Sequence, residues 1–377
     1  MKVQGEFLIL SPLEIISEIS RFLKKDISIK HIGKNVKLES ISKYKKCELI
    51  LPNKIFIRGS VLGLLKGEML QSRNSLSDFV FANSNPIAIN LVLEFLRNLK
   101  INILDIRTCL EICCKDVDEV EKLKKDAIKF WKEKTGICIQ KVKLRPEFKP
   151  RCIHGTLHLR ISNKLLRAFL QILVNLGIEV AKSNKMFAID FLRGLIAAEG
   201  NVNINPKTKC LRMVRISSKL ESDRKDYKEI LRCVGIEIFS KDMKSVSKEK
   251  ANKLGWKSGR GGAVLINRFS NFVLLLENRI FALCPEKEKK FLDGFVQMKS
   301  TKNLLRFRKL PKRFSLKIMK EVFGLSSQPR DTKNHFLKLG FIRLVSGSGK
   351  SRDPFIFELT KRAKKVLREI ENHMGLV

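Results

Sequence analysis

The sequence predicts an α+β protein of more than one domain, and three observations lead to this prediction. The chain has 377 residues, more than the roughly 100 to 200 that one domain usually contains. Apolar stretches at helical spacing are mixed with short alternating segments such as Leu157, Leu159 and Ile161, without the regular strand and helix alternation of a parallel sheet. One apolar segment also occurs twice, which indicates two related halves.

The charge of the chain points to a polyanionic partner. Lys and Arg number 76 against 38 Asp and Glu, which gives a net charge of +38. Such an excess makes a compact state repel itself, and it is commonly retained because nucleic-acid phosphates neutralise it with release of counterions. A membrane-surface protein would concentrate its cations beside an amphipathic helix, whereas here they run through the whole chain. Nucleic acid is therefore the expected partner.

Targeting signals and cysteine usage indicate the compartment. The opening residues MKVQGEFLIL form too short an apolar run for a signal peptide, and no run approaches the roughly 18 residues of a membrane span. Nine cysteines, an odd number at irregular spacing, fit free thiols in a reducing environment better than a disulfide framework. We expect a cytoplasmic protein that does not bind a membrane.

Periodicity and composition divide the chain into four expected parts. Residues 1–52 should form an N-terminal helical extension, because apolar residues fall at helical spacing behind Ser11 and Pro12. The sequence gives this extension no chemistry. The remaining parts are two repeats and a C-terminal unit, at residues 53–180, 181–305 and 310–377.

The repeated segment is apolar, carries small residues four apart and ends in an acid. It reads VLGLLKGEM at Val61–Met69 and LRGLIAAEG at Leu192–Gly200. A second pair of matching segments follows in the same order. Arg160-Ile161-Ser162-Asn163 opens one apolar run and Arg268-Phe269-Ser270-Asn271 opens another. Because Ser-Asn before helical periodicity is a capping signal, each pair should begin a helix.

Small residues four apart lie on one face of a helix and allow a second helix to approach closely. Gly63 and Gly67 share such a face in the first copy, and Gly194 and Ala198 share it in the second. An ordinary pair of core helices would also use these small residues. It would not account for the acids Glu68 and Glu199.

Those two acids suggest a metal site. Each falls at the end of an apolar helix, where the macrodipole already contributes about half a negative charge and a carboxylate is unfavourable. If the two helices pair, Glu68 and Glu199 bring like charges together unless a cation binds between them. Carboxylates, the backbone carbonyls of Gly67 and Ala198 at the helix ends, and waters are the oxygen ligands that Mg²⁺ takes, and Mn²⁺ could substitute.

Both segments resemble the LAGLIDADG motif of homing endonucleases, in the single-chain form with two motifs. The resemblance covers roughly residues 55–300. It implies two pseudo-twofold αββαββα halves whose saddle-shaped antiparallel sheets sit on double-stranded DNA, in a monomer. It further implies a nuclease that hydrolyses phosphodiester bonds on both strands with Mg²⁺, an activity associated with mobile introns and inteins.

The resemblance also assigns residues to that chemistry. The motif acids Glu68 and Glu199 would ligate Mg²⁺, and a basic residue near each metal would be Arg160 or Arg268. These arginines could equally be surface residues that contact phosphate or solvent. Met69 replaces the final glycine in the first copy. If that position needed a positive φ, Met would be strained there, and a degenerate first site would leave a nickase or a binding protein that no longer cuts. The competing class of function is a catalytically inactive DNA-binding regulator or an intron-RNA maturase.

The C-terminal residues resemble a winged helix-turn-helix. Ser326-Ser327-Gln328-Pro329 should start a helix over 330–339 that Gly340 stops, followed by strands over 341–345 and 355–359 and a helix over 361–371. In that architecture one helix enters the major groove and the wing touches the DNA backbone. The alternative is a unit that packs on protein. The expected DNA contacts are Arg330, Lys333, Asn334 and Lys338 on the helix, and Lys350 and Arg352 in the wing.

Other chemistries are not supported. Cys152, His154 and His158 lack the second ligand pair of a zinc finger, and Cys109, Cys113 and Cys114 lie among apolar residues like core thiols. The GSGKS segment at 347–351 lacks the first glycine of a phosphate-binding loop and lies between expected strands.

Overall fold

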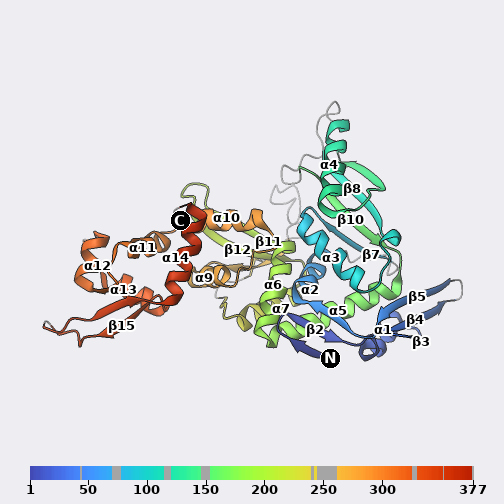
Figure 1. Ribbon diagram of the computed structural model, residues 1–377, viewed down its shortest axis with the longest axis horizontal. Helices are drawn as coiled ribbons and strands as arrows, with labels where there is room; N and C mark the ends of the chain where they lie inside the picture. Colours follow the sequence, from blue (N-terminus) through green and yellow to red (C-terminus); the bar gives the residue numbers. More distant parts are fainter. Residues whose placement is uncertain are drawn as a thin grey trace, which may run out of the picture. The chain divides into compact units, whose positions relative to one another are not determined.

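The structure is a computed structural model, and it contains mixed helices and small sheets (Figure 1), so the α+β prediction is confirmed. The chain divides into two compact units. The first comprises Met1–Gly200, Ile216–Val264 and Ile280–Cys284, and the second comprises Asn201–Arg215, Leu265–Arg279 and Pro285–Val377. The structure describes residues 1–42, 45–69, 78–113, 120–145, 153–238, 242–243, 261–324, 329–350 and 352–375. Cys114, Cys152, Ser326, Ser327, Gln328 and Ser351, which the sequence analysis named, lie outside these residues.

The first 58 residues are mostly strands. The helix expected behind Ser11 is present, and Ser11 forms a capping box with Glu14. Residues 1–52 nevertheless contain five strands, so the prediction of a helical extension is wrong for this segment. The alternation in β4 and β5 explains the difference, because it buries one side of each strand. The elements are β1 (Lys2–Gln4), β2 (Phe7–Leu10), η1 (Pro12–Ile15), α1 (Ile16–Leu23), β3 (Ser28–Ile32), β4 (Asn35–Ser42), β5 (Lys45–Pro52) and β6 (Ile55–Arg58).

A four-stranded sheet dominates the first unit. Its order is β7-β10-β8-β9, with β8 and β9 parallel and the other pairs antiparallel. Leu157, Leu159 and Ile161 in β10 are buried, as their alternation predicts, on the face where helices contact β7 and β8. The strands are β7 (Phe79–Asn83), β8 (Arg107–Cys113), β9 (Lys141–Arg145) and β10 (Thr156–Ile161), and the helices are α2 (Gly59–Glu68), α3 (Pro86–Asn98), η2 (Ile103–Asp105), α4 (Val120–Thr135) and α5 (Lys164–Ser183).

Helix α2 lies in backbone contact with α6 (Lys185–Glu199). A Cβ on Gly63 would lie 2.1 Å from the Phe191 carbonyl oxygen, and one on Gly194 would lie 1.9 Å from the Ser60 carbonyl oxygen. Neither position has room for a side chain. Gly59 faces Phe187 at one end of the pair and Gly67 faces Ala198 at the other. The two helices are therefore parallel, and their C-terminal ends meet.

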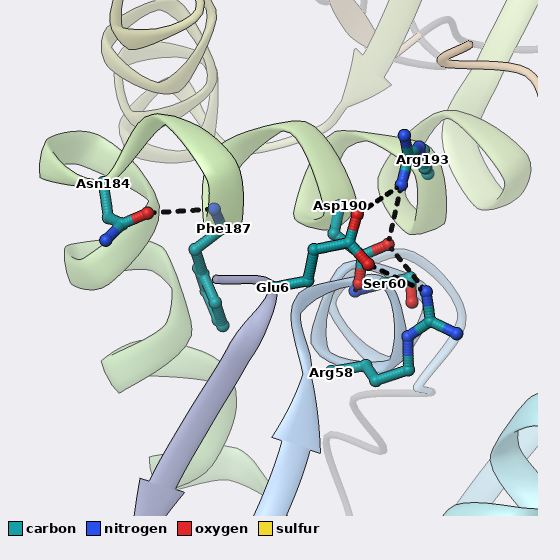
Figure 2. A network of polar contacts seen from close by, with 7 residues as sticks. All are labelled: Glu6, Arg58, Ser60, Asn184, Phe187, Asp190 and Arg193. Atoms are coloured by element: carbon teal, nitrogen blue, oxygen red, sulfur yellow. Dashed lines mark hydrogen bonds and ion pairs between the residues drawn. The ribbon is translucent and has the colours of Figure 1, made fainter. Parts of the chain in front are cut away.

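The N-terminal end of this helix pair is held by a buried carboxylate (Figure 2). Asp190 of α6 is fully buried, and its Oδ2 accepts a 2.8 Å hydrogen bond from the backbone N–H of Ser60, in the first turn of α2. The N-cap residue of α2 is Arg58, and its side chain makes no capping hydrogen bond. The capping group therefore comes from α6. Arg58 and Arg193 both approach Asp190 Oδ1 at 3.4 Å and both pair with Glu6. One helix thus supplies the N-cap of the other.

The second motif helix leads into a three-stranded sheet of order β11-β12-β13. Helix α7 follows β12 and belongs to the first unit, whereas α9 and α10 belong to the second. The bounds are β11 (Gly200–Ile204), β12 (Leu211–Ser218), α7 (Glu221–Cys233), β13 (Gly262–Ile266), α9 (Phe269–Glu277) and α10 (Pro285–Val296).

Over Lys299–Met374, the described residues combine four α-helices and one 3-10 helix with a small antiparallel sheet of order β14-β16-β15. Phe307, Phe314, Phe336 and Phe357 form its buried core. The predicted helix ends where Gly340 takes a φ of 67°. Within the second unit, α14 packs against α9 and α10. The elements are α11 (Lys299–Arg306), η3 (Phe307–Lys309), β14 (Arg313–Ser315), α12 (Leu316–Phe323), α13 (Pro329–Lys338), β15 (Ile342–Ser346), β16 (Ile356–Leu359) and α14 (Lys361–Met374). Among the described residues, no helix has the length and apolar character needed to cross a bilayer.

The close contact between α2 and α6 predicts that even an alanine at position 63 destabilises the protein. Gly63→Ala should lower the free energy of unfolding by about 1–3 kcal/mol, because the new methyl group meets the Phe191 carbonyl. Alanine otherwise favours a helix by about 1 kcal/mol over glycine, so a loss identifies the clash. Urea denaturation would measure it. Gly261→Ala is the control, since its nearest neighbour would be 3.8 Å away. Equal effects of the two substitutions would contradict the close packing.

Candidate active site at the paired helix ends

The structure brings the C-terminal ends of the two motif helices together. Helix α2 ends at Glu68 and α6 ends at Glu199. A Cβ on Gly67 would lie 2.5 Å from Ala198 Cβ and 3.0 Å from Glu199 Cγ, so the Glu199 side chain lies against the last turn of α2. All four residues are half-buried, whereas the preceding turns are mostly buried. Both carboxylates thus stand at the partly exposed end of an apolar helix pair.

Met69 follows Glu68 without backbone strain. Its φ and ψ are −71° and 107°, and Gly200 after Glu199 has −72° and 143°. Both residues are extended, so neither position needs the left-handed conformation that favours glycine. Met69 forms a β-bridge with Phe81 of β7. The condition under which Met69 would be strained is therefore not met.

Asn83 contacts the first acid. Its Nδ2 donates a 3.1 Å hydrogen bond to Glu68 Oε1. The other side of the same amide is fixed, because Asn83 Oδ1 accepts from the backbone N–H of Asn85 at 2.8 Å. Asn83 is the last residue of β7 and is 7% exposed. Asn83 was not predicted as a site residue, although a polar residue at a buried position of an alternating strand could have indicated a functional contact.

The second acid has different neighbours, which lie around α7. Burial, together with the Asp223 and Glu199 carboxylates, raises the pKa of the Tyr227 phenol. Lys66, two residues before Glu68, pairs with Asp223 at 2.8 Å, and both side chains are largely buried. Ser218 Oγ donates to the other oxygen of Asp223 at 2.8 Å. The two acids therefore stand in chemically different surroundings.

The two arginines expected near the acids differ in their placement. Arg160 lies in β10 of the first unit, and its Nε donates to Asp78 Oδ2 at 2.7 Å. Arg268 lies in the second unit, as the N-cap residue of α9. The predicted Ser-Asn cap is present in the first copy, where Asn163 accepts from Leu166 N.

In the second copy the capping prediction is wrong, because α9 begins at Phe269 and already includes Ser270 and Asn271. Asn271 is buried within this helix. The helix starts one turn early relative to the first copy, immediately after the short strand β13 ends at Ile266. Sequence similarity between the two segments thus exceeds the similarity of their local structures.

The face of the four-stranded sheet that points away from the helices is basic. Residue pairing puts alternate positions of β8, β9 and β10 on this face. The carboxylates there are Asp78 and Glu111, and both pair with arginines. Of these cations only Arg160 was expected from the sequence, although the alternation of basic residues over 141–145 was visible. They are Arg107, Lys141, Lys143, Arg145 and Arg160.

In the C-terminal unit, Arg330, Asn334 and Lys338 of α13 are exposed. Lys333 differs, because it is half-buried with its ammonium group 6.0 Å from the centre of the Phe357 ring. Lys350 forms a β-bridge with Asp353 between β15 and β16, and Arg352 is exposed. The expected contact residues therefore lie on one helix and one hairpin, with Lys333 turned partly toward the core.

A cation bound at the helix ends would have the Glu68 and Glu199 carboxylates and backbone carbonyl oxygens as ligands. Within the described part of the chain, no three His, Cys, Asp or Glu side chains gather as metal ligands. The carbonyls of a last helical turn, here those including Gly67 and Ala198, have no partner within the helix. Two carboxylates with such carbonyls form a hard, all-oxygen donor set, which fits Mg²⁺ or Mn²⁺ and leaves room for water. His154, one of the rejected zinc ligands, stacks on Phe130.

No family model matches the chain, and no curated protein matches it. Among solved structures, the chain is similar to mesophilic variants of the homing endonuclease I-DmoI, at 15% identity and a TM-score of 0.29, over 59% of this chain and 94% of that one. It is also similar to I-DmoI in complex with DNA and Mn, at 15% identity and a TM-score of 0.28, over 59% and 95%. For I-DmoI with DNA and Ca the values are 16%, 0.29, 61% and 94%.

The Lys66–Asp223 pair should stabilise the second half of the site. Lys66→Met leaves the Asp223 carboxylate largely buried without its cation, which should cost roughly 1–3 kcal/mol of unfolding free energy. Adding Asp223→Asn should restore part of the loss, as measured by a double-mutant cycle. Lys124→Met, which breaks a helix-surface pair with the exposed Glu121, should change stability by less than about 0.5 kcal/mol. Equal losses for the two lysines would contradict this role.

Proposed function

We propose that the chain is a site-specific endonuclease that hydrolyses both strands of double-stranded DNA with Mg²⁺. One observation carries the proposal: two parallel helices in backbone contact end together in Glu68 and Glu199. The C-terminal ends of both helices carry partial negative charge, and each also carries a carboxylate in a half-buried place. A bound cation would offset this concentration of negative charge. The net charge of +38 supports a nucleic-acid substrate.

Each acid would serve one strand in this proposal. Glu68 with the Gly67 carbonyl, and Glu199 with that of Ala198, would hold the metal. Bound Mg²⁺ would lower the pKa of an attacking water and stabilise charge on the phosphate. Asn83 fixes the orientation of the Glu68 carboxylate through a 3.1 Å hydrogen bond. Arg160 keeps a fixed guanidinium through Asp78, and we propose that it contacts phosphate near the first acid, as Arg268 would near the second.

We also propose DNA-binding roles for the rest of the molecule. The repeats at 53–180 and 181–305 would be the two halves of a LAGLIDADG-type saddle, and the basic outward face of β8, β9 and β10 would contact the duplex. Residues 310–377 would act as a winged helix-turn-helix that adds DNA contacts through α13 and the β15–β16 hairpin. Its support is the element order, the antiparallel sheet β14-β16-β15 and the exposed polar face of α13.

The proposal predicts strand-specific defects. The wild-type chain should cut both strands of target duplexes in a randomised library when Mg²⁺ is present. Glu199→Gln and Glu68→Gln should each reduce cutting of a different strand by roughly 100-fold or more, because each removes one metal ligand. End-labelled strands on a denaturing gel would separate the two. Glu179→Gln is the control, because Glu179 is exposed on α5. Tight DNA binding without cutting in Mg²⁺ or Mn²⁺ would indicate a regulator instead, and preference for RNA in competition would indicate a maturase.

The C-terminal unit should contribute affinity and not chemistry. Arg330→Ala with Lys338→Ala removes two exposed cations from α13, which should weaken DNA binding and reduce the slope of log affinity against log salt by about 2. Cutting at saturating protein should remain. Lys364→Ala with Lys365→Ala changes two exposed cations of α14 and should have a smaller effect. If both double variants weaken binding equally, α13 has no particular role in contacting DNA.

A further inference from the structure

The basic residues on the outward face of the four-stranded sheet are of two kinds. Arg145 and Arg160 are each held by a carboxylate, Glu111 and Asp78 respectively. Among the described residues, Arg107, Lys141 and Lys143 have no ion-pair partner, and all three are exposed. Phosphate attraction explains the second kind. It does not explain why a surface meant for a polyanion would retain two acids, since each acid opposes phosphate binding.

Glu111 is placed in a defined way. It lies in the middle of β8, opposite Thr156 of β10 and Lys143 of β9. Its backbone is packed closely, because a Cβ on Gly155 would lie 2.5 Å from the Glu111 carbonyl oxygen. Glu111 Oε1 lies 2.9 Å from Arg145 Nε. The Glu111 side chain is 16% exposed and that of Arg145 is 53% exposed, so the acid stands at the base and the guanidinium projects outward.

The contact lies at Nε, and among the described residues Glu111 is the carboxylate that pairs with this guanidinium. Arginine can donate two parallel hydrogen bonds to the O6 and N7 of guanine, and these bonds require its planar group to take one orientation. A free arginine loses side-chain entropy when it forms those bonds. The ion pair with Glu111 narrows the range of positions open to the Arg145 side chain before any DNA binds. A restricted arginine suits an oriented contact, such as a bidentate contact to a base or the one proposed for Arg160 beside the first acid, whereas a free lysine suits phosphates that demand no particular orientation.

His158 completes the surroundings of Glu111. Its Nε2 lies 3.9 Å from Glu111 Oε2, beyond hydrogen-bonding distance. Burial lowers the pKa of His158 despite the nearby carboxylate, so the imidazole is mostly neutral near pH 7 and leaves the Glu111 charge to Arg145. Lys143 and Arg145, also close to this cluster, further lower the pKa. The geometry therefore favours one principal pair, Glu111 with Arg145.

We propose that Arg145 reads a guanine in the major groove and that Glu111 is the positioning residue that orients it. The inference rests on the proposed binding of DNA but not on cutting. Lys141, Lys143 and Arg107 would contact phosphates around that base pair. Specificity at this position then depends on an acid that itself weakens the general attraction for DNA.

The test is selection of bound duplexes from a randomised library with the full chain in EDTA, where no metal-dependent cutting occurs. The wild-type chain should enrich guanine at one position by roughly 5- to 150-fold. Arg145→Lys keeps the charge and should lose that enrichment. Glu111→Gln should relax the same position while tightening binding to a non-specific duplex, because an anion has been removed. A purely structural role for Glu111 would not produce opposite changes in specificity and in non-specific affinity.

Lys141→Met is the matched control, because Lys141 lies on the same face of the same strand, β9. It should weaken binding to all sequences alike, reduce the salt slope by about 1 and leave the enriched guanine unchanged. The inference is overturned if Arg145→Lys and Glu111→Gln select the same sequences as the wild-type chain, whether or not the protein cuts DNA. Selection that succeeds while Mg²⁺ produces no scission would refute the proposed nuclease and leave this inference standing. Failure to retain any duplex would refute both.

Discussion

Direct backbone contact between α2 and α6 is the constraint on which the candidate site depends. Gly63 and Gly194 allow each helix to touch carbonyl groups of the other, and no residue with a Cβ could do so at these distances. The parallel arrangement then follows from the order of the contacts, from Gly59 at one end to Gly67 at the other. A parallel pair must bring its two C-terminal ends to one place, and with them Glu68 and Glu199. The two helix ends meet because the glycines are small.

This arrangement separates structural polar groups from chemical ones. At the N-terminal end, Asp190 is fully buried and its charge is met by a backbone amide and two arginines. At the C-terminal end, Glu68 and Glu199 are half-buried and stand against the macrodipoles. Acidic side chains therefore stand at both ends of the pair, one buried beside two arginines and two half-buried at the C-terminal ends of the helices.

Sequence patterns predicted the paired helices but not the residues that complete them. Glycine spacing and terminal acids are local features, so Val61–Met69 and Leu192–Gly200 could be recognised without a structure. Asn83 and the Lys66–Asp223 pair join residues far apart in the chain, and no local pattern indicates such contacts. The strands of residues 1–52 were missed for a different reason. One amphipathic helix gave a clear signal there, whereas the alternation in β4 and β5 depends on few apolar residues, Val36 and Leu38 in one strand and Leu49 and Leu51 in the other.

The cap supplied by Asp190 has a consequence for how the halves depend on each other. Helix α2 begins at Gly59 without a capping side chain of its own, and the carboxylate that completes its first turn comes from α6, 130 residues later in the chain. A fragment that stops before Lys185 would therefore carry an apolar helix with an unfinished start and an uncovered glycine face. Residues before Lys185 alone would lack the carboxylate that completes the first turn of α2, because Asp190 lies in α6.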